Sequence, residues 1–263
     1  MIKLCVAGAS GRMGGTVVRE AAARGFEIVG AIAASNDPSQ GKTLRELGLG
    51  NSELRIVDPS RLREAVENAD VYVSFTSPEA ELSNIPIVAG IGKRIVMGTT
   101  GLTEDQMNQL KSTVSSKVPA VFAPNFAIGI NVLLNLLKSL ETLPKDYDFS
   151  VIEMHHSKKK DAPSGTAMAI AKQISQMRGY SATVYGRSGI SLRKPEEIEV
   201  VALRGGGIPG VHQIVVAGPH EMLMIEHFSL SRSVFAHGAL YAAEWITKQT
   251  RPGVYSLNDV LSG

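Results

Sequence analysis

One stretch near the start of the chain decides the fold: Ile2-Lys3-Leu4-Cys5-Val6-Ala7-Gly8-Ala9-Ser10-Gly11-Arg12-Met13-Gly14. Residues 2–7 form a short apolar run, as in a buried strand, and the apolar spacing after Gly14 is that of a helix. A strand, a glycine turn and a helix in this order are the context of a dinucleotide-binding motif. The spacing is G-x-x-G-x-x-G, with Ser10 where the commoner motif has its second glycine. The stretch predicts a Rossmann-like unit that binds a dinucleotide; the alternative is a glycine turn without a ligand.

The alternation of strands and helices continues through the first half of the chain. The predicted strands cover residues 28–33, 70–75, 94–97 and 120–123, and Val57 closes a further short one. The predicted helices cover residues 60–69, 78–90 and 103–117, the last opened by a capping box of Thr103 and Gln106. Because such an alternation needs right-handed crossovers, it predicts a doubly wound parallel sheet in an α/β fold.

Ligands of such sheets bind beyond the carboxyl ends of the strands. Three loops that contain small, hydroxyl or proline residues fall at this edge, at positions 76–78, 98–101 and 124–126. Together with the glycine motif they supply the candidate cofactor-binding residues. These are Gly8, Ala9, Ser10, Gly11, Arg12, Met13, Gly98, Thr99, Thr100, Ala123, Pro124, Asn125 and Phe126.

The end of the second predicted strand should select between NADH and NADPH. An acidic residue there binds the adenosine ribose and repels a 2′-phosphate. The chain runs through Ala34, Ser35 and Asn36 before it reaches its first acid, Asp37. Ser35, Asn36 and Arg12 are able to hydrogen-bond a phosphate instead. The sequence therefore leans slightly to NADPH, while Asp37 leaves NADH open.

A second stretch carries the chemistry: Glu153-Met154-His155-His156-Ser157-Lys158-Lys159-Lys160-Asp161-Ala162-Pro163-Ser164-Gly165-Thr166. It lies between a predicted strand, residues 148–154, and a predicted helix, residues 167–177. Histidine changes protonation near neutral pH, and neighbouring ammonium groups lower its affinity for a proton. The N-terminus of the following helix favours an anion. We interpret the stretch as an active-site loop for a small acidic substrate; the alternative is a solvated basic loop before an ordinary helix cap.

The rest of the second half reads as a separate α+β domain. After a predicted helix over residues 128–143, short strands are predicted at 183–185, 199–203, 213–216 and 222–229, followed by a helix at 234–247. We expect the tail, residues 254–257, to pack back on the first domain. The predicted domains are therefore residues 1–126 plus 236–263, and residues 127–235. Among the remaining histidines, His212 and His220 are candidate neighbours of the site, and no spacing implies a metal.

Composition sets outer limits on function. The chain has 263 residues, 44% of them hydrophobic, and a formal net charge of +2, so nothing in the overall charge points to nucleic acid or an acidic membrane. It has no run of about 18 apolar residues. Its N-terminus leads straight into the glycine motif, which is unlike a cleaved signal. A single cysteine, Cys5, rules out a disulfide within the chain and indicates a cytosolic protein.

Several segments resemble the 4-hydroxy-tetrahydrodipicolinate reductase family, long called dihydrodipicolinate reductase. The resemblance rests on residues 6–14, 98–101, 123–126, 153–166 and 208–212, in the family's order along nearly the whole chain. The segment 153–166 is highly specific, whereas the glycine motif alone is not. The chain departs from the family at Ala34 and Ser35, where well-known members have an acid, often followed by arginine.

The resemblance implies a reaction and roles for particular residues. It implies hydride transfer from NADH or NADPH to a cyclic unsaturated imine acid, with loss of water, on the diaminopimelate route to lysine. It implies that His155 is the general acid and that Lys159 is also catalytic. It further implies a homotetramer built through the second domain's sheet. The implied ligands of the substrate carboxylates are His156, Ser164, Gly165 and Thr166.

Three other functions are weighed against this one. An aspartate-semialdehyde dehydrogenase forms a thioester on a cysteine, and Cys5 inside the first strand cannot serve. A homoserine dehydrogenase lacks the paired histidines. A redox-sensing protein that only binds NAD(H) needs the glycine motif but not His155 and Lys159. Substrate-dependent oxidation of the cofactor would separate a reductase from such a sensor.

Overall fold

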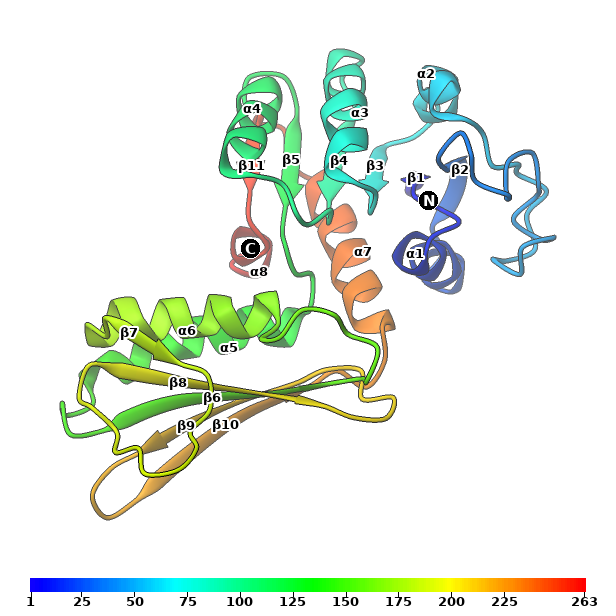
Figure 1. Ribbon diagram of the computed structural model, residues 1–263. Helices are drawn as coiled ribbons and strands as arrows, with labels where there is room; N and C mark the ends of the chain where they lie inside the picture. Colours follow the sequence, from blue (N-terminus) through cyan, green and yellow to red (C-terminus); the bar gives the residue numbers. More distant parts are fainter. The chain divides into compact units, whose positions relative to one another are not determined.

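The computed structural model describes residues 1–263 and divides into two compact units (Figure 1). Unit 1 comprises Met1–Ile128 together with Arg232–Gly263, and unit 2 comprises Gly129–Ser231. The chain thus leaves unit 1, builds unit 2 and returns to unit 1. No helix has the length and apolar character needed to cross a membrane.

Unit 1 contains a six-stranded sheet in which every neighbouring pair is parallel. The strands are β1 (Lys3–Ala7), β2 (Glu27–Ile32), β3 (Val71–Ser74), β4 (Arg94–Met97), β5 (Pro119–Phe122) and β11 (Gly253–Tyr255). Their order is β11-β5-β4-β3-β1-β2, so the chain changes direction across the sheet between β2 and β3. The predicted doubly wound parallel sheet is confirmed, and its switch point lies between β1 and β3, where such sheets bind ligands.

Helices cover both faces of this sheet (Figure 1). They are α1 (Arg12–Ala23), α2 (Leu62–Val66), α3 (Pro78–Gly90), α4 (Glu104–Val114), α7 (Ser233–Thr247) and α8 (Leu257–Leu261). One apolar core contains α1, α7 and α8 with Leu4 and Val6 of β1, and the other contains α2, α3 and α4 with Cys5 and Ala7. Because both faces of the strands are buried, the strands are apolar throughout rather than alternating.

The connection between β2 and α2 differs from the prediction. Val57 forms only an isolated parallel bridge with Ile32, so the short strand predicted there is wrong. The segment turns repeatedly at glycines with positive φ, at Gly41, Gly48 and Gly50, which leaves no run straight enough to pair. The helix predicted over residues 60–69 is also shorter than expected: a 3-10 turn, Pro59–Arg61, precedes α2.

Unit 2 is a mixed five-stranded sheet in the order β10-β9-β6-β8-β7. The strands are β6 (Asp148–His155), β7 (Ala182–Val184), β8 (Glu197–Arg204), β9 (Val211–Ala217) and β10 (Met222–Phe228). The central strand β6 pairs in parallel with β8 and antiparallel with β9. Helices α5 (Ile128–Ser139) and α6 (Gly165–Arg178) lie together on one face of the sheet (Figure 1). The predicted separate α+β domain is confirmed.

The second face of the unit 2 sheet carries exposed apolar side chains. Leu203 is 49% exposed, Met222 59%, Met224 54% and Phe228 57%. They belong to β8 and β10 and alternate with residues that point toward α5 and α6. We call the surface formed by these four residues the open sheet face.

Candidate active site

The alternation of β6 brings two polar side chains to the helix-covered side of the unit 2 sheet. Phe149 and Val151 are fully buried against α5 and α6, and Glu153 and His155 continue the same face at the end of the strand. Glu153 is 0% exposed and His155 is 9% exposed. A strand whose apolar residues form the core therefore ends in a buried carboxyl group and a histidine.

Glu153 joins three elements of unit 2. Its Oε2 lies 2.5 Å from His155 Nδ1 and accepts a hydrogen bond from Arg204 Nη1 at 2.9 Å. Its Oε1 accepts from Arg204 Nη2 at 2.8 Å and from the Ser164 backbone N–H at 2.9 Å. Burial alone would raise the pKa of Glu153, but these hydrogen bonds bring it below its ordinary value. Glu153 is therefore ionised, and it holds His155 to β8 and to the start of α6.

His155 has one ring nitrogen committed and one left for chemistry. Nδ1 faces Glu153, so it carries the proton in the neutral ring and Nε2 is the basic nitrogen. Nε2 lies on the side of Gly210, where a Cβ would be 3.1 Å away. Burial lowers the pKa of His155, Glu153 opposes this, and the charges of Lys159 and Arg204 lower it further. When the His155 ring is protonated, it therefore holds its second proton weakly and can give it up readily.

His212 is a second histidine of the cluster. Its ring meets that of His155 edge-to-face, with centroids 5.2 Å apart, and its Nε2 lies 3.1 Å from Ser164 Oγ. Burial lowers the pKa of His212 to about 4, so it is neutral near pH 7. The expectation for His220 is wrong: it lies in the turn after β9, at the opposite end of that strand from His212.

Only one of the three consecutive lysines folds back toward the cluster. The Lys159 side chain is 22% exposed and its Nζ lies 2.8 Å from Asp161 Oδ1, whereas Lys158 and Lys160 are exposed. Burial acts to raise the pKa of Asp161, but its bond with Lys159 lowers it, so the two groups form an ion pair. Lys159 thus provides fixed positive charge that is felt at His155.

The predicted ligands of the substrate carboxylates, at and before the start of α6, differ in their accessibility to solvent. Ser164 is 2% exposed, and its hydroxyl both caps the helix at Ala167 N (3.2 Å) and bonds His212. Its side chain therefore positions the helix rather than facing outward. Gly165 is exposed, and Thr166 and His156 are half-buried, so these three are reachable from solvent.

The glycine motif of unit 1 leaves a helix N-terminus open. A Cβ at Gly14 would lie 2.0 Å from the Gly8 carbonyl oxygen, and Gly8 itself has φ +75°. Gly11 is the exposed N-cap of α1, and no side chain caps that helix. Backbone N–H groups at an uncapped helix N-terminus favour a phosphate. The motif therefore fits the pyrophosphate of a dinucleotide.

Some of the predicted cofactor-binding residues are buried beneath the loops at the sheet edge, and others are exposed on these loops. Gly98 leaves room for the Phe75 ring, which would lie 2.1 Å from a Cβ there, and Phe75 meets Phe126 edge-to-face at 5.9 Å. The predicted residues that are buried, and so support the loops from within, are Ala9, Thr99, Ala123 and Phe126. The predicted residues that are exposed are Gly11, Arg12, Thr100 and Pro124, whereas Gly8, Ser10, Met13, Gly98 and Asn125 are partly exposed.

Asp37 lies against the glycine motif. Its Oδ2 accepts a hydrogen bond from Ser10 Oγ at 2.8 Å, and its Oδ1 accepts from Ser39 N at 2.8 Å. The hydrogen bonds from Ser39 lower the pKa of Asp37, so the carboxylate is charged. The chain thus carries an anion beside the motif although Ala34 and Ser35 replace the acid of well-known members.

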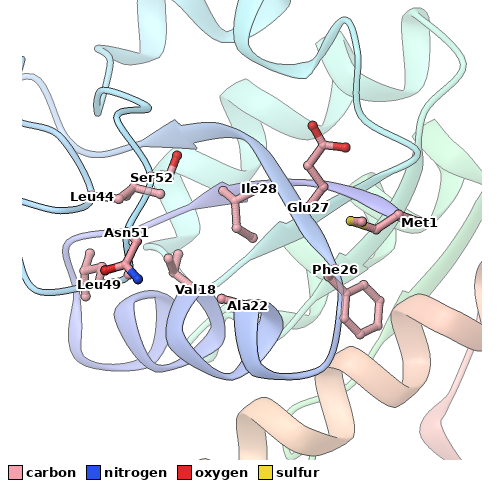
Figure 2. A pocket seen from close by; sticks show the side chains of 11 residues that line it. Met1, Val18, Ala22, Phe26, Glu27, Ile28, Leu44, Leu49, Asn51 and Ser52 are labelled. Atoms are coloured by element: carbon pink, nitrogen blue, oxygen red, sulfur yellow. The ribbon is translucent and has the colours of Figure 1, made fainter.

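A pocket of unit 1 lies elsewhere. It has a volume of about 300 Å³ and opens between α1, the start of β2 and residues 44–52, with Val18, Phe26 and Leu49 among its lining (Figure 2). None of the predicted site residues lines it. It is therefore separate from the glycine motif.

Sequence reasoning did not assign roles to Glu153 or Arg204. For Glu153 a signal existed, because residues two apart on a strand share a face and His155 had been singled out. Arg204 gave none. It reaches Glu153 because β8 pairs in parallel with β6 and sets Arg204 opposite His155, and strand order cannot be read from local patterns.

Comparisons with known proteins agree over the full chain. Family models described as dihydrodipicolinate reductase match residues 2–126 (N-terminus) and residues 129–261 (C-terminus). A 4-hydroxy-tetrahydrodipicolinate reductase from Methanosarcina acetivorans is 40% identical, with 99% of each chain covered. One from Methanopyrus kandleri is 38% identical, covering 100% of this chain and 98% of that one.

Solved structures show the same fold at lower identity. A dipicolinate-bound dihydrodipicolinate reductase from a Paenisporosarcina species has a TM-score of 0.75 at 23% identity, with 97% of each chain covered. An amine dehydrogenase from Mycobacterium smegmatis has a TM-score of 0.67 at 14% identity, covering 98% of this chain and 95% of that one. The resemblance predicted from the motifs is confirmed by the family models and the curated relatives. The chain belongs to the dihydrodipicolinate reductase family and is an NAD(P)H-dependent oxidoreductase of that family.

Proposed function

We propose that the chain reduces 4-hydroxy-tetrahydrodipicolinate to tetrahydrodipicolinate in the diaminopimelate route to lysine, with His155 as the proton donor. The reaction consumes a hydride and a proton and releases water, and the nicotinamide of the bound cofactor supplies the hydride. The observation that carries the proposal is the buried cluster of Glu153, His155 and Arg204 at the end of β6. In this cluster the ionised Glu153 carboxylate binds one ring nitrogen of His155, and the other ring nitrogen is free.

We propose that His155 takes up its second proton when negative charge beyond that of Glu153 comes close to it. Burial lowers its pKa, which favours the neutral ring in the free protein. A substrate with two carboxylates adds negative charge, and nearby negative charge raises the proton affinity of a histidine. Glu153 then stabilises the imidazolium through Nδ1. We propose that substrate binding and protonation of His155 reinforce each other, which would prepare the acid when the substrate is present.

The remaining residues of the loop bind and orient the substrate in this proposal. His156, Gly165 and Thr166, with the N-terminus of α6, receive the carboxylates, and the buried Ser164 holds that helix start in place. Lys159, paired with Asp161, either neutralises substrate charge or keeps His155 poised. The Paenisporosarcina reductase was solved with dipicolinate, which supports a small dicarboxylate as the substrate class.

The first test is the oxidation of NADH and of NADPH, followed at the nicotinamide absorbance. The substrate is the condensation product of pyruvate and aspartate semialdehyde. We expect substrate-dependent oxidation, and a loss of about 10²- to 10⁴-fold in turnover in His155→Gln, the range typical of a positioned general acid. The affinity for the cofactor should stay unchanged. Cofactor binding without oxidation would support a redox sensor instead.

We propose that NADH is used at least as well as NADPH, because Asp37 places a negative charge against the glycine motif. This differs from the slight lean to NADPH that the sequence gives. Asp37→Ser should raise kcat/KM for NADPH relative to NADH by about tenfold or more, since a charge repulsion of 1.4 kcal/mol is tenfold. Glu53→Gln, which removes an exposed charge of the same unit, is the control. An unchanged ratio in Asp37→Ser would contradict the assignment.

Three further expectations belong to the proposal. We infer a homotetramer in which the open sheet face of unit 2 is covered by another copy of the chain. The cytosolic location stays a prediction that rests on the single cysteine, and the absence of a metal stays a prediction that rests on histidine spacing.

A further inference from the structure

A buried glutamate lies beneath the loops of unit 1 that carry predicted cofactor residues. Glu81 belongs to the first turns of α3, after the N-cap Ser77, and is 0% exposed. Its carboxyl group takes no part in the chemistry proposed for His155. No basic side chain hydrogen-bonds it, so it is not half of a salt bridge.

The hydrogen-bond partners of the Glu81 carboxyl group are three hydroxyls at the carboxyl ends of two neighbouring strands. Oε1 accepts hydrogen bonds from Thr99 Oγ1 at 2.5 Å and from Thr76 Oγ1 at 2.6 Å. Oε2 accepts from Ser74 Oγ at 3.1 Å. In addition, the backbone N–H of Thr76 donates to Thr99 Oγ1 at 2.8 Å. The loop after β3 and the loop after β4 are thereby joined through one carboxyl group.

Burying this carboxyl group costs folding free energy unless its oxygens accept hydrogen bonds. Desolvation raises the pKa of Glu81, and the three hydroxyl hydrogen bonds only partly oppose it. An apolar residue of similar volume would fill the same space without this cost. What an apolar residue cannot do is fix the directions of two threonine side chains and, through them, the backbone of two loops.

We propose that Glu81 is a positioning residue for the dinucleotide, which holds the loops after β3 and β4 in the arrangement that receives it. The inference rests on the proposed function, in which the dinucleotide binds at this edge of the sheet. Thr99 is buried and its hydroxyl is already used, so it supports the loop from within, whereas Thr100 beside it is exposed. Glu81 therefore acts on the cofactor through the loops and does not touch it.

The ionisation state of Glu81 should alter this arrangement. An ionised carboxylate accepts from all three hydroxyls, whereas a protonated one donates its own proton to one of them, so that hydroxyl must change from donor to acceptor. The Glu81 charge also acts on Tyr72 of β3, whose pKa burial and this charge keep well above its ordinary value, so Tyr72 stays neutral. The affinity for the cofactor should therefore fall as Glu81 becomes protonated at lower pH.

The test compares Glu81→Gln with Glu79→Gln in the full chain. Glu79 is exposed and lies in the same turn of α3, so its replacement removes the same charge without touching the cluster. The readout is the dissociation constant of NADH without substrate, from nicotinamide fluorescence, together with the melting temperature. We expect Glu81→Gln to weaken NADH binding by about five- to tenfold, as for the net loss of one hydrogen bond. Glu79→Gln should change it less than about twofold.

The pH dependence separates positioning from stability alone. The wild-type dissociation constant should rise as the pH falls and Glu81 becomes protonated, and Glu81→Gln should remove that rise. A lower melting temperature with an unchanged dissociation constant would overturn the inference. If Glu81→Gln does not fold, Thr76→Val, which removes one hydroxyl at constant shape, must weaken NADH binding in the same direction or the inference fails. Wild-type protein that bound no dinucleotide would overturn the proposed function itself, and this inference with it.

Discussion

Glu153 makes four hydrogen bonds and is fully buried, so replacing it by glutamine tests its role at the scale of one residue. The amide keeps the shape but loses the charge that favours protonated His155. We expect Glu153→Gln to lower kcat by about 10²-fold or more and to move the alkaline limb of the pH–rate profile, where His155 loses its proton, to lower pH. The control is Glu199→Gln, which breaks an ion pair with Arg187 elsewhere in the sheet. A reduced kcat with an unshifted profile would mean that Glu153 does not tune His155.

His212 should make the protein less stable in acid. Its pKa is about 4 in the folded chain and 6.5 as the ordinary value, so between these values the unfolded chain binds a proton that the folded chain does not. The free energy of unfolding should therefore fall by about 3 kcal/mol as the pH falls from about 6.5 to about 4, and stay level below that. Urea unfolding across this range measures it. The fall should shrink in His212→Gln and persist in His220→Gln, and an equal fall in both variants would rule out His212 as its source.

At the scale of elements, Gly14 is required for the packing of α1 on β1. A Cβ there would lie 2.0 Å from a backbone oxygen, which cannot move without shifting the glycine turn. Gly14→Ala should therefore lower the free energy of unfolding by about 1–3 kcal/mol. Gly90→Ala is the matched control, because a Cβ at the end of α3 meets nothing within 4 Å and alanine favours a helix. If both substitutions changed the free energy of unfolding equally, the close contact at Gly14 would not be the cause of the loss of stability.

The elements that the sequence predicts well are those that local sequence features mark, such as a capping residue, a proline or an apolar run. Helix α3 begins at Pro78, after a serine cap, and β4 covers Arg94–Met97, both as predicted, because a cap, a proline and an apolar run mark them locally. The segment between β2 and α2 was not predictable, since its path is set by glycine turns and contacts with distant residues. The same holds for the site: the histidines and the start of α6 follow from spacing, whereas Arg204 depends on strand order and the use of the Ser164 hydroxyl depends on His212.

At the scale of the whole molecule, the open sheet face of unit 2 should decide the oligomeric state. Met224 points away from α5 and α6 and is 54% exposed, so Met224→Lys should leave the fold of the unit intact. If another copy covers this face, burying a lysine there is unfavourable and the assembly should dissociate. Light scattering after size-exclusion chromatography gives the mass. Gln109→Lys, on the exposed surface of α4, should keep the wild-type mass. An unchanged mass for Met224→Lys would exclude this face as the interface.

The return of the chain to unit 1 has a consequence for its biosynthesis. A large share of one core of unit 1 comes from the last thirty or so residues, namely Ala236, Ala239, Leu240, Ala242, Ala243, Ile246, Leu257 and Val260. During synthesis, residues 1–128 leave the ribosome well before these C-terminal residues have been made. Until then the apolar surface that they cover in unit 1 stays exposed. Unit 2 is continuous and can bury its own core earlier. The order of folding should therefore be the reverse of the order of synthesis, and a nascent chain stalled before residue 232 should bind chaperones through unit 1.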